Sequence, residues 1–258
     1  LLQCGRSLLF GGGVTVDPWR TEPGVQIHGP GRSKILLGAD TAPQWLEHLD
    51  LIEQSVSENG GRSCINASGV WTPSHGRELA EALAQRLAQI EARKLTDDRA
   101  RIAAFSNPEV ARRISQMIDS QLTVPGAEDL TARYRNGERL AQTDGCTFLL
   151  PTVVWCEDSS HPLADTEFLF PFVSVVEAPQ AELPAAIGPS LVVTALTNRR
   201  DFVVDLLNAP NIERLNIGPI PTNRIEWDQP HEGNLFELLY QQRALQIRSS
   251  GPLQDALV

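Results

Sequence analysis

One cysteine, Cys64, lies in a stretch whose residue types could support nucleophilic chemistry, Asn59-Gly60-Gly61-Arg62-Ser63-Cys64-Ile65-Asn66-Ala67-Ser68. The glycine pair allows a close backbone approach that a β-carbon would obstruct. A thiolate in such a turn can attack a substrate carbonyl, because ionised sulfur is a strong nucleophile. The competing interpretation is that Cys64 is an ordinary small buried residue, which is the commoner fate of a free cysteine. The local sequence leaves both interpretations open.

The segments on either side of Cys64 are expected to form a helix and a strand. Apolar residues recur at spacings of three and four between positions 43 and 59, which predicts a helix that starts near Pro43 and ends at Asn59-Gly60. These apolar residues are Leu46, Leu49, Ile52 and Val56. The β-prone run Gly69-Val70-Trp71-Thr72 follows the cysteine. Cys64 is therefore expected in a turn between a helix and a strand.

Strands and helices alternate along the rest of the chain. The predicted extended segments are 7–10, 25–28, 34–37, 69–72, 130–134, 139–142, 148–154 with a bend at Pro151, 173–176, 191–195, 215–217 and 244–248. The predicted helices are 43–59, 76–94, 108–122, 201–207 and 234–241, and the buried face of 108–122 is expected at Val110, Ile114, Met117 and Ile118. This alternation predicts an α/β fold with a mainly parallel sheet flanked by helices.

Two glycine-rich stretches resemble phosphate loops only superficially. Gly11-Gly12-Gly13 and Gly29-Pro30-Gly31 both lack the spacing of a Walker motif or of a complete dinucleotide-binding fingerprint. Pro18 and Pro23 also argue against a helix directly after Gly13. Taken alone, both stretches are predicted to be turns.

Composition excludes several classes of function. The chain has 258 residues and a formal charge of −10, which disfavours nucleic acid and anionic lipid as partners. No apolar run approaches the roughly 20 residues that span a bilayer, and no cluster of His, Cys and Asp has metal-ligand spacing. Four cysteines without a C-x-x-C pair indicate a reducing, cytoplasmic compartment. Because the chain opens in a β-prone run and not at Met, we expect it to be part of a longer polypeptide.

Six short segments carry a resemblance to a known family. In chain order they are Phe10-Gly11-Gly12, Leu36-Leu37-Gly38-Ala39-Asp40, Gly61-Arg62-Ser63-Cys64, Leu150-Pro151-Thr152-Val153, Glu167-Phe168-Leu169-Phe170-Pro171 and Arg214-Leu215-Asn216-Ile217. They resemble, in order and at similar spacings, the F-x-G-S turn, the E-L-G-G-K segment, the G-Q-x-C nucleophile motif, the P-T-V strand, the E-x-F-G-P motif and the V-N strand of the aldehyde dehydrogenase superfamily. The resemblance covers nearly the whole chain and implies an aldehyde-dehydrogenase-like catalytic domain.

The resemblance implies roles for four residues. Cys64 would attack an aldehyde to form a thiohemiacetal, hydride would pass to NAD or NADP, and the thioester would go to water or to coenzyme A. The backbone N–H of Cys64 would be one donor to the oxyanion. Glu167 would hold the nicotinamide ribose hydroxyls, and Gly11 or Gly12 would let the backbone pass close to the cofactor. The substrate would be an aldehyde or an acyl-CoA.

Several positions depart from the family pattern. Leu36 matches the glutamate that activates water in the E-L-G-G-K segment, and leucine cannot accept a proton. This departure favours acyl transfer to coenzyme A over hydrolysis. Arg62 replaces a glutamine, Gly69 an arginine, and Leu169 and Phe170 replace phenylalanine and glycine. The Phe170 substitution is expected to put a bulky ring near the ribose position.

The resemblance also implies a domain plan. Residues 1–38 would end the dinucleotide-binding domain, residues 39–232 would form the catalytic domain, and residues 233–258 would form a helix and strand returning towards the cofactor and oligomerisation region. The N-terminal half of the same polypeptide would be the missing partner, and the assembly would be a homo-oligomer. Without that half, the chain is expected to bind NAD poorly and to turn over little.

Two other interpretations remain open. In the first, the chain is a non-catalytic member of the family that acts as a binding or structural subunit, with Leu36 and Phe170 as signs of a lost site. In the second, Cys64 belongs to an unrelated thiol hydrolase with a histidine partner. The candidate histidines are His28, His48, His75, His161 and His231, and no spacing singles one of them out.

Overall fold

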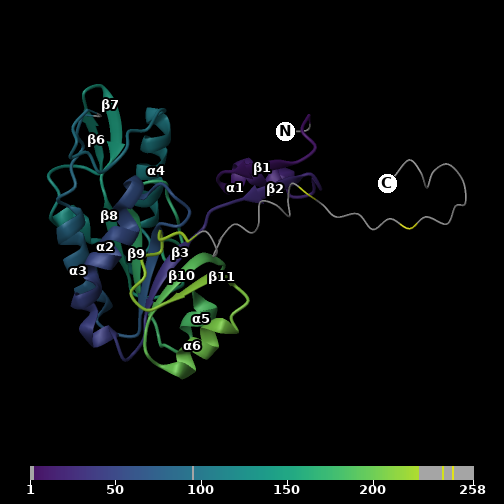
Figure 1. Cartoon of the computed structure of the whole chain (residues 1–258). Helices are drawn as coiled ribbons and strands as arrows, with labels where there is room; N and C mark the ends of the chain where they lie inside the picture. The colour runs from purple at the N-terminus through teal and green to yellow at the C-terminus, as the bar shows by residue number, and fades with distance from the viewer. Residues whose placement is uncertain (1–2, 95, 227–239, 241–245, 247–258) are drawn as a thin grey trace, which may run out of the picture. The chain divides into compact units, whose positions relative to one another are not determined.

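The computed structural model describes residues 3–94, 96–226, Tyr240 and Gln246 (Figure 1). The chain divides after His28, so that one compact unit contains Leu1–His28 and the other is Gly29–His231. The boundary predicted after residue 38 differs, because the strand that precedes it is central to the larger unit's sheet. Residues 233–258 were predicted to form a helix at 234–241 and a strand at 244–248. This segment, except for Tyr240 and Gln246, lies outside the described residues.

The smaller unit is built on two parallel strands, β1 (Ser7–Phe10) and β2 (Val25–His28). A helix, α1 (Gly13–Val16), and a 3-10 turn, η1 (Asp17–Trp19), connect them. The prediction that the prolines exclude a helix directly after Gly13 was wrong. Helix α1 ends before Pro18, which lies in the first turn of η1, where the absence of an N–H costs no hydrogen bond.

The larger unit is built on a seven-stranded sheet with the order β11-β10-β3-β4-β9-β8-β5. All neighbouring strands are parallel except β5 and β8, so the predicted mainly parallel α/β fold is confirmed. The strands are β3 (Ser33–Leu37), β4 (Ala67–Thr72), β5 (Ala127–Asp129), β8 (Thr152–Cys156), β9 (Phe172–Glu177), β10 (Ser190–Leu196) and β11 (Ile212–Ile217). A separate antiparallel hairpin joins β6 (Leu140–Thr143) to β7 (Cys146–Leu149).

Helices cover both faces of this sheet (Figure 1). They are α2 (Leu49–Ser57), α3 (Gly76–Leu87), α4 (Pro108–Gln121), α5 (Leu183–Ala186) and α6 (Arg200–Leu207), and a 3-10 segment, η2 (Ala42–His48), precedes α2. Helices α2 and α3 share one hydrophobic core with Ile35 and Leu37, whereas α4, α5 and α6 share the other with Leu36. Successive residues of β3 therefore serve opposite cores, as the period of a strand requires.

Some expectations about single elements were wrong. The segment predicted to be extended at 130–134 begins as a 3-10 turn, η4 (Leu130–Arg133), because the Asp129 side chain accepts a hydrogen bond from the N–H of Ala132 and caps it. In α4, Met117 is 43% exposed, and Ala111 takes the buried position beside Ile118. Pro151 does mark a break, since it separates β7 from β8.

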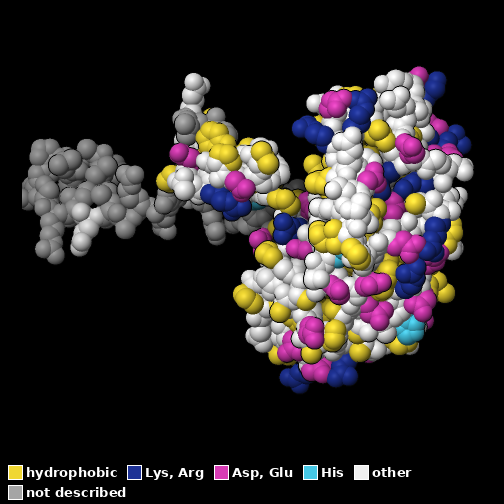
Figure 2. Space-filling model, turned by 180° about the vertical axis from the view of Figure 1, so that it is seen from behind, with side chains coloured by type: hydrophobic (Ala, Val, Ile, Leu, Met, Phe, Trp, Pro, Cys, Tyr) yellow, Lys and Arg dark blue, Asp and Glu magenta, His cyan; other side chains and the backbone are white. Residues whose placement is uncertain are grey.

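The visible surface of the larger unit carries both signs of charge. Figure 2 shows acidic and basic side chains interspersed with apolar ones over that face. Within the described residues, no helix is long and apolar enough to cross a membrane. The same part of the chain holds no group of three or more His, Cys, Asp or Glu side chains that could bind a metal ion.

A buried ion cluster fixes the segment between β5 and β7 against α4. The Asp129 carboxylate accepts hydrogen bonds from Arg135 at 2.7 Å and Arg139 at 2.9 Å, and all three side chains are less than a tenth exposed. Arg139 also reaches Asp119 and the carbonyl of Ser115 in α4. Burial opposes ionisation of Asp129, yet the two guanidinium groups hold the pKa of Asp129 below its ordinary value.

Replacing Asp129 with asparagine should destabilise the larger unit by about 3 to 5 kcal/mol, because two buried cations lose their counter-ion. Urea unfolding at neutral pH measures this effect. A depressed carboxyl pKa stabilises the fold above the unfolded pKa, so the difference from wild type should shrink as pH falls below about 4. Glu91→Gln, which removes the exposed partner of Arg93, is the control and should change little. A small, pH-independent effect of Asp129→Asn would contradict this account.

Candidate functional site

Four parallel strands bring their amino ends to one edge of the sheet. Strands β10, β3, β4 and β9 are neighbours, so the segments that lead into them lie side by side. Cys64 lies just before β4, Arg32 just before β3, and Glu167 in the segment leading to β9. The topology therefore gathers two of the predicted site residues, Cys64 and Glu167, at the same edge.

The turn before Cys64 has an unusual backbone. Asn59, Gly60 and Gly61 have φ angles of 55°, 66° and 65° within a 3-10 segment, η3 (Glu58–Gly61). A β-carbon on Gly61 would lie 2.5 Å from the backbone nitrogen of Pro171, a distance that no side chain tolerates. The close approach expected at the glycine pair is found at Gly61, and it packs the Cys64 turn against the segment that carries Glu167.

Asn66, which the sequence analysis did not single out, holds this turn in place. Its amide nitrogen donates to the carbonyls of Ser55 and Glu58 at 2.9 and 3.0 Å, and its oxygen accepts from the N–H of Ser63. The side chain is 5% exposed. Asn66 thus joins both sides of the Cys64 turn to the end of α2. Its place two residues after the candidate nucleophile is the feature of the sequence that could have pointed to this role.

The chain leading into β3 lies directly against Cys64. A β-carbon on Gly31 would lie 2.0 Å from the carbonyl oxygen of Cys64, so only glycine fits there. Two residues further on, the Ser33 hydroxyl donates to the same carbonyl at 2.8 Å. The segment also bonds to the start of β10, where the Gly31 carbonyl accepts a hydrogen bond from the N–H of Leu191. Cys64 is therefore positioned by residues 31–33.

Glu167 contacts the same segment through its partly buried carboxylate. The carboxylate accepts a hydrogen bond from the backbone N–H of Arg32 at 2.5 Å. Burial raises the pKa of Glu167 to about 6, although the N–H groups of Arg32 and Gly31 and the charge of Lys34 act in the opposite direction. Glu167 and Cys64 are hence linked by the backbone of residues 31–33, which bonds to both.

Arg62 fastens a second loop beside the cysteine. Its guanidinium group donates to the carbonyls of Ala103 and Ala104 at 3.0 Å and lies 4.7 Å from the ring centre of Phe105. Burial lowers the pKa of Arg62 from its ordinary value. At the position where the resemblance expects glutamine, this chain thus has a cation that holds residues 103–105 against the Cys64 turn.

The structure does not support the matching of Leu36 to a catalytic base. Leu36 is fully buried in the core shared by α4, α5 and α6. It lies three residues after Ser33 in β3, which at about 3.3 Å per residue is roughly 10 Å along the strand from the contact with Cys64. A leucine at this position therefore carries no information about how a thioester would be released.

The ring of Phe170 was expected near the ribose position, but it lies in the protein core. It is 3% exposed and packs with Phe168 and Phe172, at ring-centre distances of 6.1 and 6.0 Å. The neighbouring Leu169 is the exposed residue of this segment, at 51%. A tight turn, in which the N–H of Phe170 donates to the Phe168 carbonyl at 2.9 Å, puts the ring in the core and the leucine outside, so Phe170 does not obstruct the surface near Glu167.

Gly11 and Gly12 lie in the smaller unit, at the turn between β1 and α1. A β-carbon on Gly11 would meet the Thr15 side chain at 2.9 Å, whereas one on Gly12 would have no atom within 4 Å. Gly12 has a φ of −67°, which any residue can adopt. Of the two predicted cofactor-contacting glycines, Gly11 is thus sterically required and Gly12 borders open space.

The other described cysteines differ from Cys64 in their surroundings. Cys156 is buried in β8, and burial raises the pKa of its thiol to about 12, which makes it a poor nucleophile. Cys4 is exposed and Cys146 is partly exposed in the β6–β7 hairpin. Among the candidate histidine partners, His161 is engaged structurally, because its ring accepts from the N–H of Leu163 at 3.1 Å.

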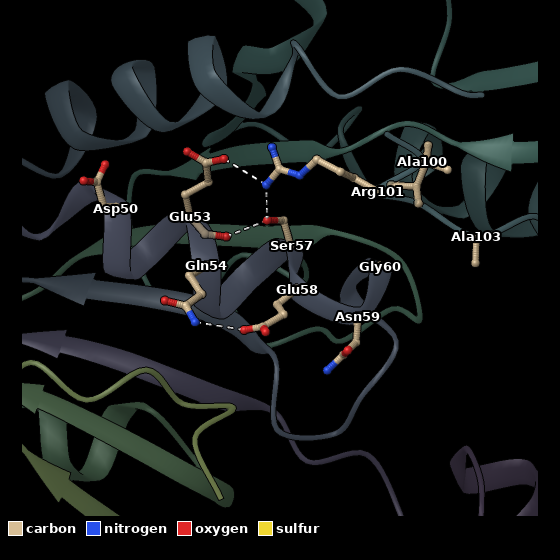
Figure 3. Close-up of a pocket in the computed structure, with 11 residues that line it drawn as sticks. Asp50, Glu53, Gln54, Ser57, Glu58, Asn59, Gly60, Ala100, Arg101 and Ala103 are labelled. Atoms are coloured by element: carbon tan, nitrogen blue, oxygen red, sulfur yellow. Dashed lines mark hydrogen bonds and ion pairs between the residues drawn. The ribbon is translucent and has the colours of Figure 1, made fainter. Parts of the chain in front are cut away.

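A cavity of about 700 Å³ is lined by residues of α2, of η3 and of the loop 100–103 (Figure 3). Figure 3 shows Glu53 and Ser57 of α2 facing Arg101, which bonds to both at 3.0 Å. Asn59 and Gly60 form part of its wall, but neither Cys64 nor Glu167 lines it. The cavity is therefore adjacent to the turn without being part of the candidate site.

Comparison with known proteins gives a fold. No protein-family model and no curated protein matches the chain in sequence. Solved structures do match. An NAD+ complex of aldehyde dehydrogenase from Bacillus cereus has a TM-score of 0.69 and 16% identity over 84% of this chain and 44% of its own. Lactaldehyde dehydrogenase from Escherichia coli has a TM-score of 0.68 and 14% identity over 83% of this chain and 46% of its own.

A third similar structure is the aldehyde dehydrogenase KauB from Pseudomonas aeruginosa, with a TM-score of 0.68 and 15% identity over 82% of this chain and 44% of its own. The chain therefore spans less than half the length of these matched structures. The resemblance noted in the sequence is confirmed at the level of architecture: the chain has the fold of part of an aldehyde dehydrogenase.

Proposed function

We propose that this chain is the cysteine-bearing portion of an NAD(P)-dependent aldehyde dehydrogenase. The observation that carries the proposal is the convergence of Cys64 and Glu167 on residues 31–33, through the contacts of Gly31 and Ser33 with Cys64 and of Arg32 with Glu167. These are the two residues that the family resemblance assigns to the substrate and to the cofactor. The shared fold supports the same assignment.

The residues present fit a nicotinamide cofactor. A carboxylate has about four acceptor positions, so Glu167 retains capacity for ribose hydroxyls beside its bonds to backbone N–H groups. Leu169, two residues further along the chain, is exposed and offers an apolar contact for a flat ring. When bound, NAD(P) supplies the hydride acceptor.

The chemistry at Cys64 follows from the thiol. The thiolate forms a bond to the aldehyde carbon, and the carbonyl oxygen takes the negative charge as a thiohemiacetal, with the Cys64 backbone N–H proposed as a donor to it. Loss of hydride from that carbon leaves a thioester on sulfur. The thioester then passes to water or to coenzyme A. Since Leu36 lies away from the cysteine, both acceptors remain candidates.

Trapping of an acyl group on Cys64 tests this proposal. The full-length polypeptide that includes this chain is incubated with an aliphatic aldehyde and NAD or NADP. The chain itself is incubated separately with p-nitrophenyl acetate, which acylates a nucleophilic thiol without cofactor. Peptide mass spectrometry should then find the acyl group on Cys64 in preference to Cys146, although both are partly exposed. Addition of coenzyme A or its omission shows which acceptor releases the thioester.

Cys64→Ala should abolish the labelling and Cys146→Ala should leave it unchanged. Labelling by the ester but not by aldehyde with NAD(P) would limit the proposal to a reactive thiol and would favour the thiol hydrolase. Absence of selective labelling in both arms would favour the non-catalytic subunit.

Gly31→Ala should impair Cys64 without unfolding the chain. The added carbon would overlap the Cys64 carbonyl, so the turn must shift and the Ser33 hydrogen bond must lengthen. A misplacement of about 1 Å costs on the order of 100-fold in rate, and we expect a loss of that size in ester acylation at Cys64. Gly5→Ala, where a β-carbon meets nothing within 4 Å, is the matched control. Wild-type acylation in Gly31→Ala would show that the contact is not needed.

The buried charge of Glu167 should appear in the pH dependence of stability. A carboxyl whose pKa is raised from 4.5 to about 6 in the folded chain stabilises the fold below the unfolded pKa and loses that contribution as pH rises through about 6. Relative to Glu167→Gln, the wild-type unfolding free energy should fall by about 2 kcal/mol between pH 4.5 and 7. Urea titrations measure this difference. The exposed-site variant Glu138→Gln should show no such trend, and a flat difference for Glu167→Gln would rule out the burial.

A further inference from the structure

A buried lysine lies at the start of β3, behind the segment that joins Cys64 to Glu167. The side chain of Lys34 is 1% exposed. Its ammonium group donates to the Asp165 carboxylate at 2.6 Å, to the Arg32 carbonyl at 2.8 Å and to the Ser190 hydroxyl at 3.4 Å. These acceptors come from three segments at the amino edge of the sheet. Burial lowers the pKa of Lys34, while Asp165 favours the charged form.

The backbone of Arg32 is held on both sides of its α-carbon by these charged groups. Arg32 has a φ of 46°, in the left-handed region that a residue with a side chain seldom adopts. Its N–H donates to Glu167, and its carbonyl accepts from Lys34. Its guanidinium group also reaches Asp165 at 3.2 Å. A strained conformation of this kind persists only where the surroundings enforce it.

An irregularity in the sheet occurs at the same place. The pairing of β3 with β4 shifts between Ser33 and Lys34, so that Ser33 faces Ala67 while Lys34 faces Gly69. Such bulges redirect the side chains of the strand. Here Ser33 reaches the Cys64 carbonyl and Lys34 reaches Asp165 from adjacent positions. Because of the bulge, Ser33 contacts the Cys64 carbonyl and the next residue, Lys34, contacts Asp165.

We propose that Lys34 is a positioning residue, which acts through the Arg32 carbonyl and Asp165 to hold Glu167 and Cys64 in their relative places. The roles of Glu167 and Cys64 in this statement rest on the proposed function. An ion pair that only stabilised the fold would not need to bond to the Arg32 carbonyl. The geometry, in contrast, gives the lysine one bond to the strained residue and one to the carboxylate that holds the same residue's side chain.

A pair of variants separates positioning from stability. Lys34→Met leaves Asp165 without its buried partner and should lower the urea midpoint. Lys34→Met combined with Asp165→Asn removes both charges with little change in volume and should recover much of that loss, because no carboxylate is left without its partner. Neither variant restores a donor to the Arg32 carbonyl. Lys94→Met, which removes an exposed lysine 3.8 Å from Asp144, is the control.

The decisive readouts are amide exchange at Arg32 and ester acylation at Cys64. In the double variant we expect Arg32 exchange to accelerate at least about 100-fold and Cys64 acylation to fall at least about 10-fold, while the urea midpoint stays near wild type. Wild-type exchange and acylation in the double variant would overturn the positioning role. If exchange and acylation respond as expected but aldehyde with NAD(P) never labels Cys64, the proposed function fails and the positioning of the thiol stands.

Discussion

The site depends on a steric constraint at Gly31. Because this residue has no β-carbon, the chain that leads into β3 can pass against the carbonyl of Cys64, and the same residue can still pair with β10 through its own carbonyl. Any side chain there would separate β3 from the Cys64 turn. The contacts made by Ser33 and Arg32, and through Arg32 by Glu167 and Lys34, all assume this close packing.

The location of the site at amino ends of strands gives it a particular electrostatic character. Ligands of open α/β sheets usually bind beyond the carboxyl ends, but that edge is closed between β3 and β10, where Asp40 accepts hydrogen bonds from Thr197 and Asn198. At the amino edge, backbone N–H groups that precede the strands point to a carboxylate. Glu167, which is partly buried, consequently has backbone N–H donors and two cations around it.

The sequence predicted the parallel α/β fold because long apolar strands alternate with amphipathic helices, and these patterns depend on burial alone. It also predicted a turn at Cys64, since Gly60 and Gly61 permit positive φ. The cluster of Lys34, Asp165 and Arg32 could not be predicted, because it joins segments more than a hundred residues apart whose contact depends on strand order. Leu36 and Phe170 were misplaced for a related reason. Motif matching assigns a residue to a position along the chain, whereas the packing of the core, which takes in both side chains, decides whether a side chain meets the site.

Phe170 has a consequence for how this chain can differ from proteins of the same fold. The resemblance expects glycine there, yet the ring completes a cluster in which Phe168 meets Phe172 edge to face at 4.8 Å. Exchanging it for the expected residue would leave a void in the core, at a cost of the order of 3 to 5 kcal/mol. Phe170 is therefore part of the interior packing of this chain, and glycine at this position alone would not be tolerated without loss of stability.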